Sequence, residues 1–286
     1  MENLNNLLAK AESLLERLEK VLMPQSEPVN WEAAAWRWLK AGGKGTLQAI
    51  ASPHQVRLQD IQFVDEQKKE IVRNTRQFLQ GLTANNVLLT GARGTGKSSL
   101  VKALLTEYAE QGLRLIEVDK HDLVDLHTIV NLISTRPEKF IIYCDDLTFE
   151  ANDSAYKALK VVLDGSLANA SDNVLVYATS NRKNLMPEFM ADNEAVAHID
   201  GEIRPGDTIE EKTALAERFG LWLSFHTFDQ NAYLAIAEYW LKKYGINFDD
   251  AARKAALQFT YSRGARSGRV AYHFAKDYAG KLKLDG

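Results

Sequence analysis

The sequence contains a single cysteine, Cys144, and no apolar run that approaches the roughly 20 residues needed to span a bilayer. One cysteine cannot form a disulfide within the chain, so a disulfide-stabilised secreted scaffold is excluded and a reducing cytoplasm is the expected compartment. The first residues include acidic and polar side chains where a signal peptide would have its apolar centre. We therefore expect a cytoplasmic protein with no membrane partner.

A surplus of positive charge is also missing. The formal net charge is −3 at pH 7, whereas proteins that bind nucleic acid often carry a basic excess. This disfavours extensive wrapping of DNA, but a local basic patch is compatible with it, so nucleic acid is left as an undecided partner. Hydrophobic residues make up 45% of the 286 residues, which is enough to build the core of one large domain or two modest ones.

The sequence does contain a complete phosphate-binding loop at residues 91–98, Gly-Ala-Arg-Gly-Thr-Gly-Lys-Ser. The loop lies between an apolar run and a helix-compatible stretch, which is the context this motif requires. Its backbone N–H groups and the helix N-terminus form an anion site. We expect Lys97 to reach the outer phosphates and Ser98 to bind Mg²⁺. The predicted nucleotide-binding residues are Gly91, Ala92, Arg93, Gly94, Thr95, Gly96, Lys97, Ser98 and Ser99.

Strand and helix patterns alternate after residue 50. Short apolar runs of the kind found in buried parallel strands predict strands near 87–90, 113–118, 140–144, 174–179 and 221–225. Helical patterns occur at 65–80, 97–111, 123–134, 152–168 and 208–219. This alternation predicts a five-stranded parallel α/β sheet covered on both faces. After residue 228 only helices are predicted, at 229–245, 248–260 and 266–280, so a helical C-terminal lid is expected.

The first 50 residues are predicted to be a helical N-terminal extension. Apolar residues at heptad spacing between positions 4 and 22 favour a helix packed on its own domain over a short coiled coil with another subunit. Asn30 is placed to cap a second helix, on which Trp31, Ala35 and Trp38 would share one face. The glycines after it are interpreted as a hinge. The predicted domains are 1–50, 51–228 and 229–286.

Two adjacent carboxylates, Asp145 and Asp146, end the apolar run 140–144. An acid at the end of a strand beside a phosphate loop can hold Mg²⁺, directly or through water. We assign that role to Asp145 together with Ser98, and we expect Asp146 to be the general base for an attacking water. Glu150, four residues further on, is the rival base.

Three further residues are predicted to complete the catalytic site. Asn181, or else Thr179, follows an apolar strand and is expected to orient the lytic water. Arg218 is expected to reach the nucleotide of a neighbouring subunit, as arginine does in trans in other nucleotide hydrolases; the alternative is an interaction with a helix C-terminus. Arg269, or else Arg266, is expected to contact the phosphates from the lid with its planar guanidinium.

In this order, the segments resemble an AAA+ ATPase over roughly residues 56–280. The resemblance identifies 91–98 as Walker A, Asp145 and Asp146 as Walker B, Asn181 as sensor 1, Arg218 as the arginine finger and Arg269 as sensor 2. Stretches 85–89, 144–147 and 218–225 are similar to a bacterial family of predicted ATP-binding AAA+ proteins that is catalogued as a domain of unknown function. The resemblance implies ATP and Mg²⁺ as cofactors, with adenine between core and lid near residues 56–64.

The chain departs from that pattern at two places. Residues 119–123 have neither the aromatic residue nor the glycine of a threading pore loop, and Asp146 stands where most such ATPases have glutamate. The predicted function is Mg²⁺-dependent ATP binding and hydrolysis that changes the shape of a homo-oligomer acting on an unknown protein client. The alternatives are an ATP-gated, loader-type adaptor with slow hydrolysis that acts on DNA or a DNA-bound protein, and a small-molecule kinase, for which we find no acceptor pocket.

Overall fold

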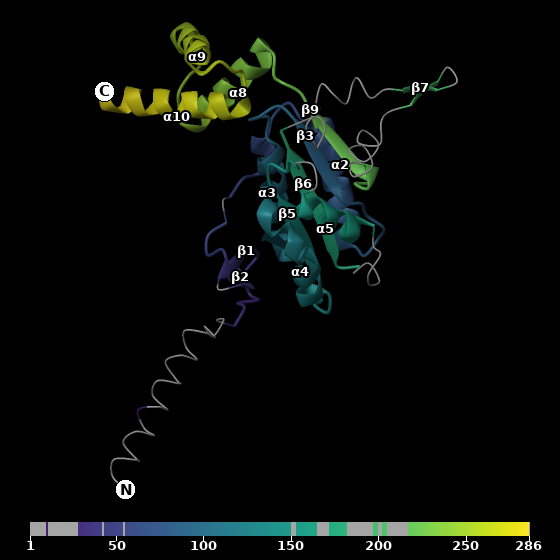
Figure 1. Cartoon of the computed structure of the whole chain (residues 1–286). Coiled ribbons are helices and arrows are strands. Elements are labelled where there is room, and N and C mark those ends of the chain that lie inside the picture. The colour runs from purple at the N-terminus through teal and green to yellow at the C-terminus, as the bar shows by residue number, and fades with distance from the viewer. Residues whose placement is uncertain are drawn as a thin grey trace.

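The computed structural model describes residues 10, 28–41, 43–53, 55–149, 153–164, 172–181, 197–199, 202–204 and 217–285. Its centre is a seven-stranded sheet with the strand order β2-β1-β4-β5-β6-β3-β9 (Figure 1). The predicted parallel strands are confirmed as β3 (Val87–Gly91), β4 (Leu113–Glu117), β5 (Lys139–Cys144), β6 (Val174–Ser180) and β9 (Leu221–Phe225). The sheet is larger than the five strands predicted because two more strands extend one edge. A separate antiparallel pair is formed by β7 (Ala197–Ile199) and β8 (Glu202–Arg204).

Helices cover both faces of the sheet. They are α2 (Asp65–Leu79), α3 (Lys97–Tyr108), α4 (Leu126–Ile133) and α5 (Ser154–Leu163), with 3-10 segments η1 (Leu58–Asp60), η2 (Ala109–Gln111) and η3 (Lys120–Asp125). α2 and α3 share a core with Leu89 and Ile141, whereas α4 and α5 pack with Leu88 and Ile142. Successive strand residues point to opposite faces, so burial of both faces explains the continuous apolar runs. The predicted helix at 208–219 lies mostly outside the described residues.

The predicted second N-terminal helix is wrong, because this part of the chain forms a β-hairpin. β1 (Ala35–Ala41) and β2 (Lys44–Ala49) pair antiparallel, and β1 joins β4 in parallel. Trp36 and Trp38 lie on the same face of β1 and are 0% and 2% exposed. The spacing of the tryptophans is compatible with both a helix and a strand. In the structure a strand forms, because it buries Trp36 and Trp38 in the core. Gly43, interpreted as part of a hinge, lies at the hairpin turn with a φ of 79°, which glycine adopts readily.

The leucine-rich helix predicted between residues 4 and 22 lies outside the described residues except for Lys10, so it stays a prediction. The division of the chain into 1–50, 51–228 and 229–286 also stays a proposal. The pairing of β1 with β4 shows, however, that the described residues before position 50 include strands that belong to the core sheet.

The helical lid is present as three helices, α8 (Gln230–Lys243), α9 (Asp250–Arg263) and α10 (Gly268–Asp285). They lie together beyond the end of the sheet (Figure 1) and enclose a hydrophobic core of their own around Tyr233, Leu241 and Phe274. The carboxylates of Asp229 and Asp249 accept hydrogen bonds from the first turns of α8 and α9, as helix N-caps do. The lid is therefore stabilised internally.

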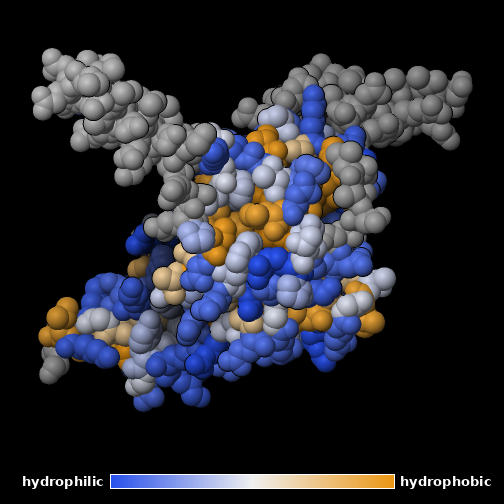
Figure 2. Space-filling model, turned by 90° about the horizontal axis from the view of Figure 1, so that it is seen from below, coloured by the Kyte–Doolittle hydropathy of each residue, from blue (hydrophilic) through white to orange (hydrophobic). Residues whose placement is uncertain are grey.

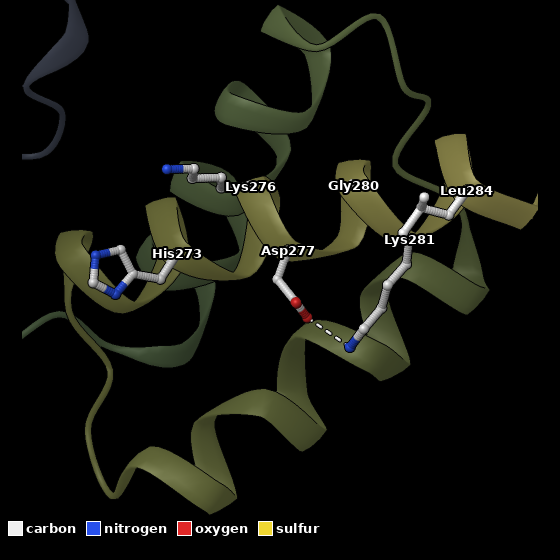
Figure 3. Close-up of a pocket in the computed structure, with 6 residues that line it drawn as sticks. All are labelled: His273, Lys276, Asp277, Gly280, Lys281 and Leu284. Atoms are coloured by element: carbon white, nitrogen blue, oxygen red, sulfur yellow. Dashed lines mark hydrogen bonds and ion pairs between the residues drawn. The ribbon is translucent and has the colours of Figure 1, made fainter.

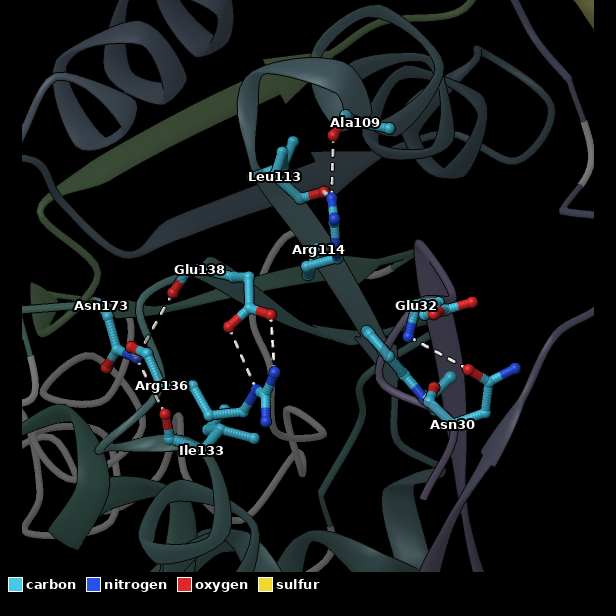
Figure 4. A network of polar contacts seen from close by, with 10 residues as sticks. Asn30, Glu32, Ala109, Leu113, Arg114, Ile133, Arg136, Glu138 and Asn173 are labelled. Carbon is cyan, nitrogen blue, oxygen red and sulfur yellow. Dashed lines mark hydrogen bonds and ion pairs between the residues drawn. The ribbon is translucent and has the colours of Figure 1, made fainter. Parts of the chain in front are cut away.

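A network of polar contacts closes the sheet where its central strands begin (Figure 4). Asn173, just before β6, is 8% exposed, and its side-chain amide donates to the carbonyls of Ile133 (2.8 Å) and Arg136 (2.9 Å). Arg136 also forms an ion pair with Glu138 at 2.7 Å. Arg114 donates to the carbonyls of Ala109, in η2, and of Leu113, the first residue of β4. Apart from the buried Nε of Arg114, which has no partner, these groups are hydrogen-bonded, so we interpret the network as structural.

Hydrophilic side chains dominate the face of the molecule shown in Figure 2, and apolar residues gather in a patch near its centre. Within the described part of the chain, none of the helices combines the length and the apolar character that a bilayer crossing requires.

Candidate nucleotide-binding site

The phosphate loop joins β3 to α3, as the sequence predicts. Gly91, Gly94 and Gly96 have φ angles of 125°, 75° and 102°, which side chains other than glycine rarely tolerate. A Cβ at Gly91 would lie 1.9 Å from the carbonyl oxygen of Phe225, and one at Gly96 would lie 3.0 Å from the side chain of Ile61. The three glycines are therefore required by the conformation of the loop, which a chance match to the motif would not explain.

Lys97 points back over the loop that precedes it. Its Nζ donates hydrogen bonds to the carbonyl oxygens of Gly91 and Ala92, both at 2.7 Å, and to Oδ1 of Asn181 at 3.1 Å. Burial lowers the pKa of Lys97, and the nearby carboxylates oppose this shift. The structure thus holds the lysine ammonium against the loop, at the place from which it would meet a bound phosphate.

The predicted metal ligands, Ser98 and Asp145, are in contact. The Oγ of Ser98 donates to Oδ1 of Asp145 at 2.7 Å, and the Oγ1 of Thr179 donates to the same oxygen at 2.5 Å. Desolvation raises the pKa of the Asp145 carboxyl, but the hydrogen bonds from Thr179 and Ser98 outweigh it, so the pKa lies below its ordinary value. Asp145 is therefore a carboxylate at neutral pH.

This donor set fits Mg²⁺, which prefers oxygen ligands and is commonly held by one or two carboxylates together with substrate phosphates. Across the described residues, no group of three or more His, Cys, Asp or Glu side chains is arranged to hold a metal ion. A metal cage made by the protein alone is therefore absent from this part of the chain. Ser98 and Asp145 would instead share the ion with the phosphates of a nucleotide.

Asp146, the predicted general base, has an unusual backbone. Its φ is 53°, a left-handed conformation in which aspartate and asparagine are enriched among non-glycine residues. Its N–H donates to the Thr179 hydroxyl at 3.0 Å, and its Oδ1 accepts from Asn181 at 2.5 Å. Arg93 lies 3.9 Å from its Oδ2. Backbone strain of this kind, about 1–3 kcal/mol, clusters at active sites.

Glu150, the rival base, lies outside the described residues, so the choice between Asp146 and Glu150 as general base stays a prediction.

Thr179 connects the two carboxylates, a role that the sequence analysis did not find. Its hydroxyl donates to Asp145 and accepts from the backbone of Asp146. The sequence named Thr179 only as an alternative to Asn181. Both contact the carboxylates, because β6 lies beside β5 in the sheet. The available signal was its position near the end of β6, level with the acids of the preceding strand.

The lid contributes the start of α10 to this site. The backbone N–H of Arg269 donates to the carbonyl of Gly94 at 3.3 Å. A Cβ at Gly94 would lie 2.7 Å from Oγ of Ser267 and 3.3 Å from Cβ of Arg269. The structure thus brings Arg269 to the phosphate loop, and its charge contributes to the lowered pKa of Lys97. Arg266 lies in the exposed link before α10.

Arg218 lies on the opposite side of the core from this loop. It comes just before β9, so it lies at the edge where the parallel strands begin, whereas the phosphate loop follows the end of β3. Its guanidinium forms an ion pair with Asp164, at the C-terminal end of α5. The structure therefore does not bring Arg218 together with the predicted site residues of its own chain.

The segment expected to adjoin adenine contacts both the core and the lid. Ile61 packs in the core with α3. Asp60 accepts a hydrogen bond from the hydroxyl of Tyr239 on α8 at 2.7 Å and forms an ion pair with Lys243. The adenine position itself stays a prediction, since these contacts show only that the segment lies between core and lid.

The lid surface also has an open hollow of about 540 Å³ along α10 (Figure 3). It is lined by His273, Lys276, Asp277, Gly280, Lys281 and Leu284. Asp277 and Lys281 pair with each other across one helical turn at 2.7 Å. None of the predicted site residues lines this hollow, so it is separate from the phosphate loop.

The chain is similar to one protein family and to several solved structures. A protein family described as "Protein of unknown function (DUF815)" matches residues 31–282. No curated protein matches the chain. Among solved structures, RuvB of Thermotoga maritima, described as a Holliday junction branch migration motor, is similar with a TM-score of 0.52 and 16% identity over 81% of this chain and 66% of that one.

Two further structures are similar in the same way. A variant of Thermotoga maritima RuvB has a TM-score of 0.53 and 14% identity over 80% of this chain and 65% of that one. AMPPCP-bound DnaA from Aquifex aeolicus has a TM-score of 0.50 and 15% identity over 80% of this chain and 64% of that one. The chain thus spans less than two thirds of the length of these solved chains. At such low identity the likeness shows the fold alone, which is that of AAA+ ATPases.

Proposed function

Because the chain belongs to the DUF815 family and has the AAA+ fold, we infer that it binds ATP with Mg²⁺ and hydrolyses it to drive shape change in a homo-oligomer. The observation that carries this inference is the junction at the ends of β3, β5 and β6. Hydrogen bonds connect the phosphate loop, whose conformation requires glycine, to the side chains at this junction. These are the Ser98–Asp145 pair and the Asp146–Asn181 pair. The protein client stays unidentified.

The residues divide the work of phosphoryl transfer, which is mostly positioning and charge neutralisation. Ser98 and Asp145 would hold Mg²⁺, which would supply positive charge to the phosphates. Lys97 adds a second positive charge over the same phosphates. Asp146 is the proposed base, and Asn181, which donates to it at 2.5 Å, keeps its carboxylate oriented toward the attacking water.

The positions of the two arginines support a site shared between subunits. Arg269 lies at the phosphate loop of its own chain through the contact of α10 with Gly94, so we assign it to the phosphates in cis. Arg218 lies at the other end of the strands, so it serves a neighbouring subunit in this proposal. A guanidinium supplied in trans stabilises the charge of the transition state.

A binding titration with the Lys97→Ala protein tests the proposal. We expect loss of ATP binding with an unchanged fold, because the lysine ammonium donates its hydrogen bonds to two carbonyls of the loop and to the side-chain oxygen of Asn181 and not to the hydrophobic core. Lys157→Ala, an exposed position on α5, is the matched control and should bind ATP normally. Equal ATP affinity in the Lys97→Ala protein and the unmodified protein would contradict the proposal.

A slow, ATP-gated switch is a second candidate, and one observation favours it. Both oxygens of Asp146 face nitrogen partners, Asn181 at 2.5 Å and Arg93 at 3.9 Å, so the base is engaged in this conformation. In that case ATP would control assembly on a partner, and turnover would be slow. Steady-state hydrolysis measured with and without DNA separates the two, since a DNA-directed switch changes its rate when DNA is present.

A further inference from the structure

Tyr143, on β5 two residues before Asp145, has a buried hydroxyl without a hydrogen-bond partner. Its side chain is 0% exposed, and the hydroxyl is one of two buried polar side-chain atoms in the described chain that make no hydrogen bond, the other being Nε of Arg114. Leaving a buried hydroxyl unpaired is unfavourable. Such orphaned groups are rare and often have a functional explanation.

The neighbouring strand provides a direct comparison. Tyr177 on β6 is paired in register with Tyr143 and is also 0% exposed. Its hydroxyl is within hydrogen-bond distance of Asn74 Nδ2 (3.0 Å) and Thr75 Oγ1 (2.9 Å). Two buried tyrosines therefore lie side by side in the sheet, and only one has its hydroxyl satisfied by the core.

The unpaired hydroxyl adjoins the candidate metal site. Burial raises the pKa of the Tyr143 phenol, the nearby charge of Asp145 raises it further, and the hydroxyls of Ser98 and Thr179 lie close enough to lower it in part. Ser98 and Thr179 are the two side chains that donate to Asp145 Oδ1. The phenol thus lies close to the Ser98–Asp145 pair and to Thr179, the oxygens that surround the candidate metal position.

We propose that Tyr143 is a positioning residue for the metal: its hydroxyl donates a hydrogen bond to the Asp145 carboxylate when Mg²⁺ and nucleotide are bound. The inference rests on the proposed function, because it requires Ser98 and Asp145 to hold the ion. A hydrogen bond from the Tyr143 hydroxyl would orient the Asp145 carboxylate toward the cation. Residues that bind a metal ligand in this way affect metal affinity even though they do not touch the metal. An apolar side chain would fill the same space without orienting the carboxylate.

The test compares Tyr143→Phe with Tyr177→Phe in the full chain. AMPPCP binding is titrated calorimetrically, first in EDTA and then across a range of Mg²⁺ concentrations, and thermal unfolding is measured without nucleotide. For Tyr143→Phe we expect unchanged affinity in EDTA, a midpoint in Mg²⁺ raised by about tenfold, and a thermal midpoint equal to or above that of the unmodified protein. For Tyr177→Phe we expect the reverse pattern, a lowered thermal midpoint and an unchanged Mg²⁺ midpoint.

Each outcome decides the inference. A Mg²⁺ midpoint in Tyr143→Phe equal to that of the unmodified protein overturns it and leaves Tyr143 as a core residue. If the Tyr143→Phe protein does not fold, Tyr143→Met, which also fills the site without a hydroxyl, is measured in the same way. If the unmodified protein and Lys97→Ala both fail to bind AMPPCP, then the proposed function itself is wrong, and that result differs from a failure of the tyrosine alone.

Discussion

The two ends of the central sheet both carry dense polar networks, but the networks differ in what they leave available. Where the strands begin, the Asn173 amide donates to backbone carbonyls, and Arg136 pairs with Glu138. Where the strands end, Asp146 has a left-handed backbone, and its side chain is 51% exposed. We call the first network, formed by Asn173, Arg136 and Glu138, the closed end, because these side chains bind backbone carbonyls or each other. We call the second, around Asp145 and Asp146, the reactive end, because it keeps a strained backbone and an accessible carboxylate beside the phosphate loop.

The difference shows how one sheet combines a structural end with a reactive end. Groups that satisfy each other lower the energy of the fold, and a group held in an unfavourable conformation persists only when its surroundings fix it. Thr179, Asn181 and Lys97 provide those surroundings for the two carboxylates. Substitutions at the reactive end should therefore change nucleotide chemistry, and substitutions of the side chains that form the closed network should change stability.

The largest effect is expected for Arg218, which lies at the closed end but is proposed to act on a neighbouring subunit. Arg218→Ala should bind ATP nearly normally and hydrolyse it about 10³–10⁵ times more slowly, as measured by steady-state phosphate release. Arg253→Ala, an exposed arginine on α9, is the control and should keep full activity. Mixing Arg218→Ala with Asp146→Asn should restore part of the rate, since some mixed interfaces pair both intact residues.

Persistent inactivity of that mixture, although the two proteins co-assemble, would show that the site is not shared. Full activity of the unmodified protein as a dilute monomer would show the same. Asp164→Asn refines the test, because Asp164 forms an ion pair with Arg218 within one chain. If that pair orients the guanidinium, we expect a smaller loss of hydrolysis than for Arg218→Ala, with ATP binding unchanged.

The next largest effect is expected at the reactive end itself. Asp146→Asn keeps a residue that tolerates the left-handed backbone but removes the base, so hydrolysis should fall about 10²–10⁴-fold while ATP binding is kept. Single-turnover hydrolysis and equilibrium binding measured together check this expectation. If Asp146→Asn hydrolyses ATP normally and Glu150→Gln does not, Glu150 is the base.

Substitution of Asn173, at the closed end, should change stability and leave nucleotide binding unchanged. Asn173→Ala removes an amide that donates to the Ile133 and Arg136 carbonyls, so we expect a loss of about 1–3 kcal/mol in the free energy of unfolding. Urea denaturation measures the loss, and the affinity for ATP should stay unchanged in the folded protein. If Asn173→Ala changed the affinity for ATP but not the free energy of unfolding, the proposed difference between a structural end and a reactive end of the sheet would be wrong.

The smallest effect is expected from acid acting on Glu138. Its hydrogen bond with Arg136 lowers the pKa of this carboxyl below the ordinary 4.5. Because the folded-state pKa is the lower one, the pair stabilises the fold at neutral pH, and the contribution is lost as the pH falls below 4.5 through the folded-state value. The free-energy difference between the unmodified protein and Glu138→Gln, about 1 kcal/mol or less, should therefore shrink in acid. A difference that grows in acid would contradict this sign.

Much of the reactive end could be predicted because its signals are local. The phosphate loop is continuous in sequence, Asp145 and Asp146 are adjacent, and an apolar run marks each central strand. The three lid helices were likewise predicted from their patterns. The hairpin was missed because Trp36 and Trp38 are spaced for a strand while Trp31, Ala35 and Trp38 are spaced for a helix. The choice depended on pairing with β4, which lies far along the chain.

By itself, then, the sequence determined the anion-binding loop, the parallel core strands and the helical lid, because each depends on residues close together in the chain. The tertiary structure alone decided which polar groups meet. Thr179 reaches Asp145 across 34 positions, Lys97 reaches Asn181 across 84, and Arg218 pairs with Asp164 across 54. These separations are bridged by the order of strands in the sheet, which places β6 between β5 and β3. Strand order is set by burial of both faces at once, a property of the whole core that no short segment carries.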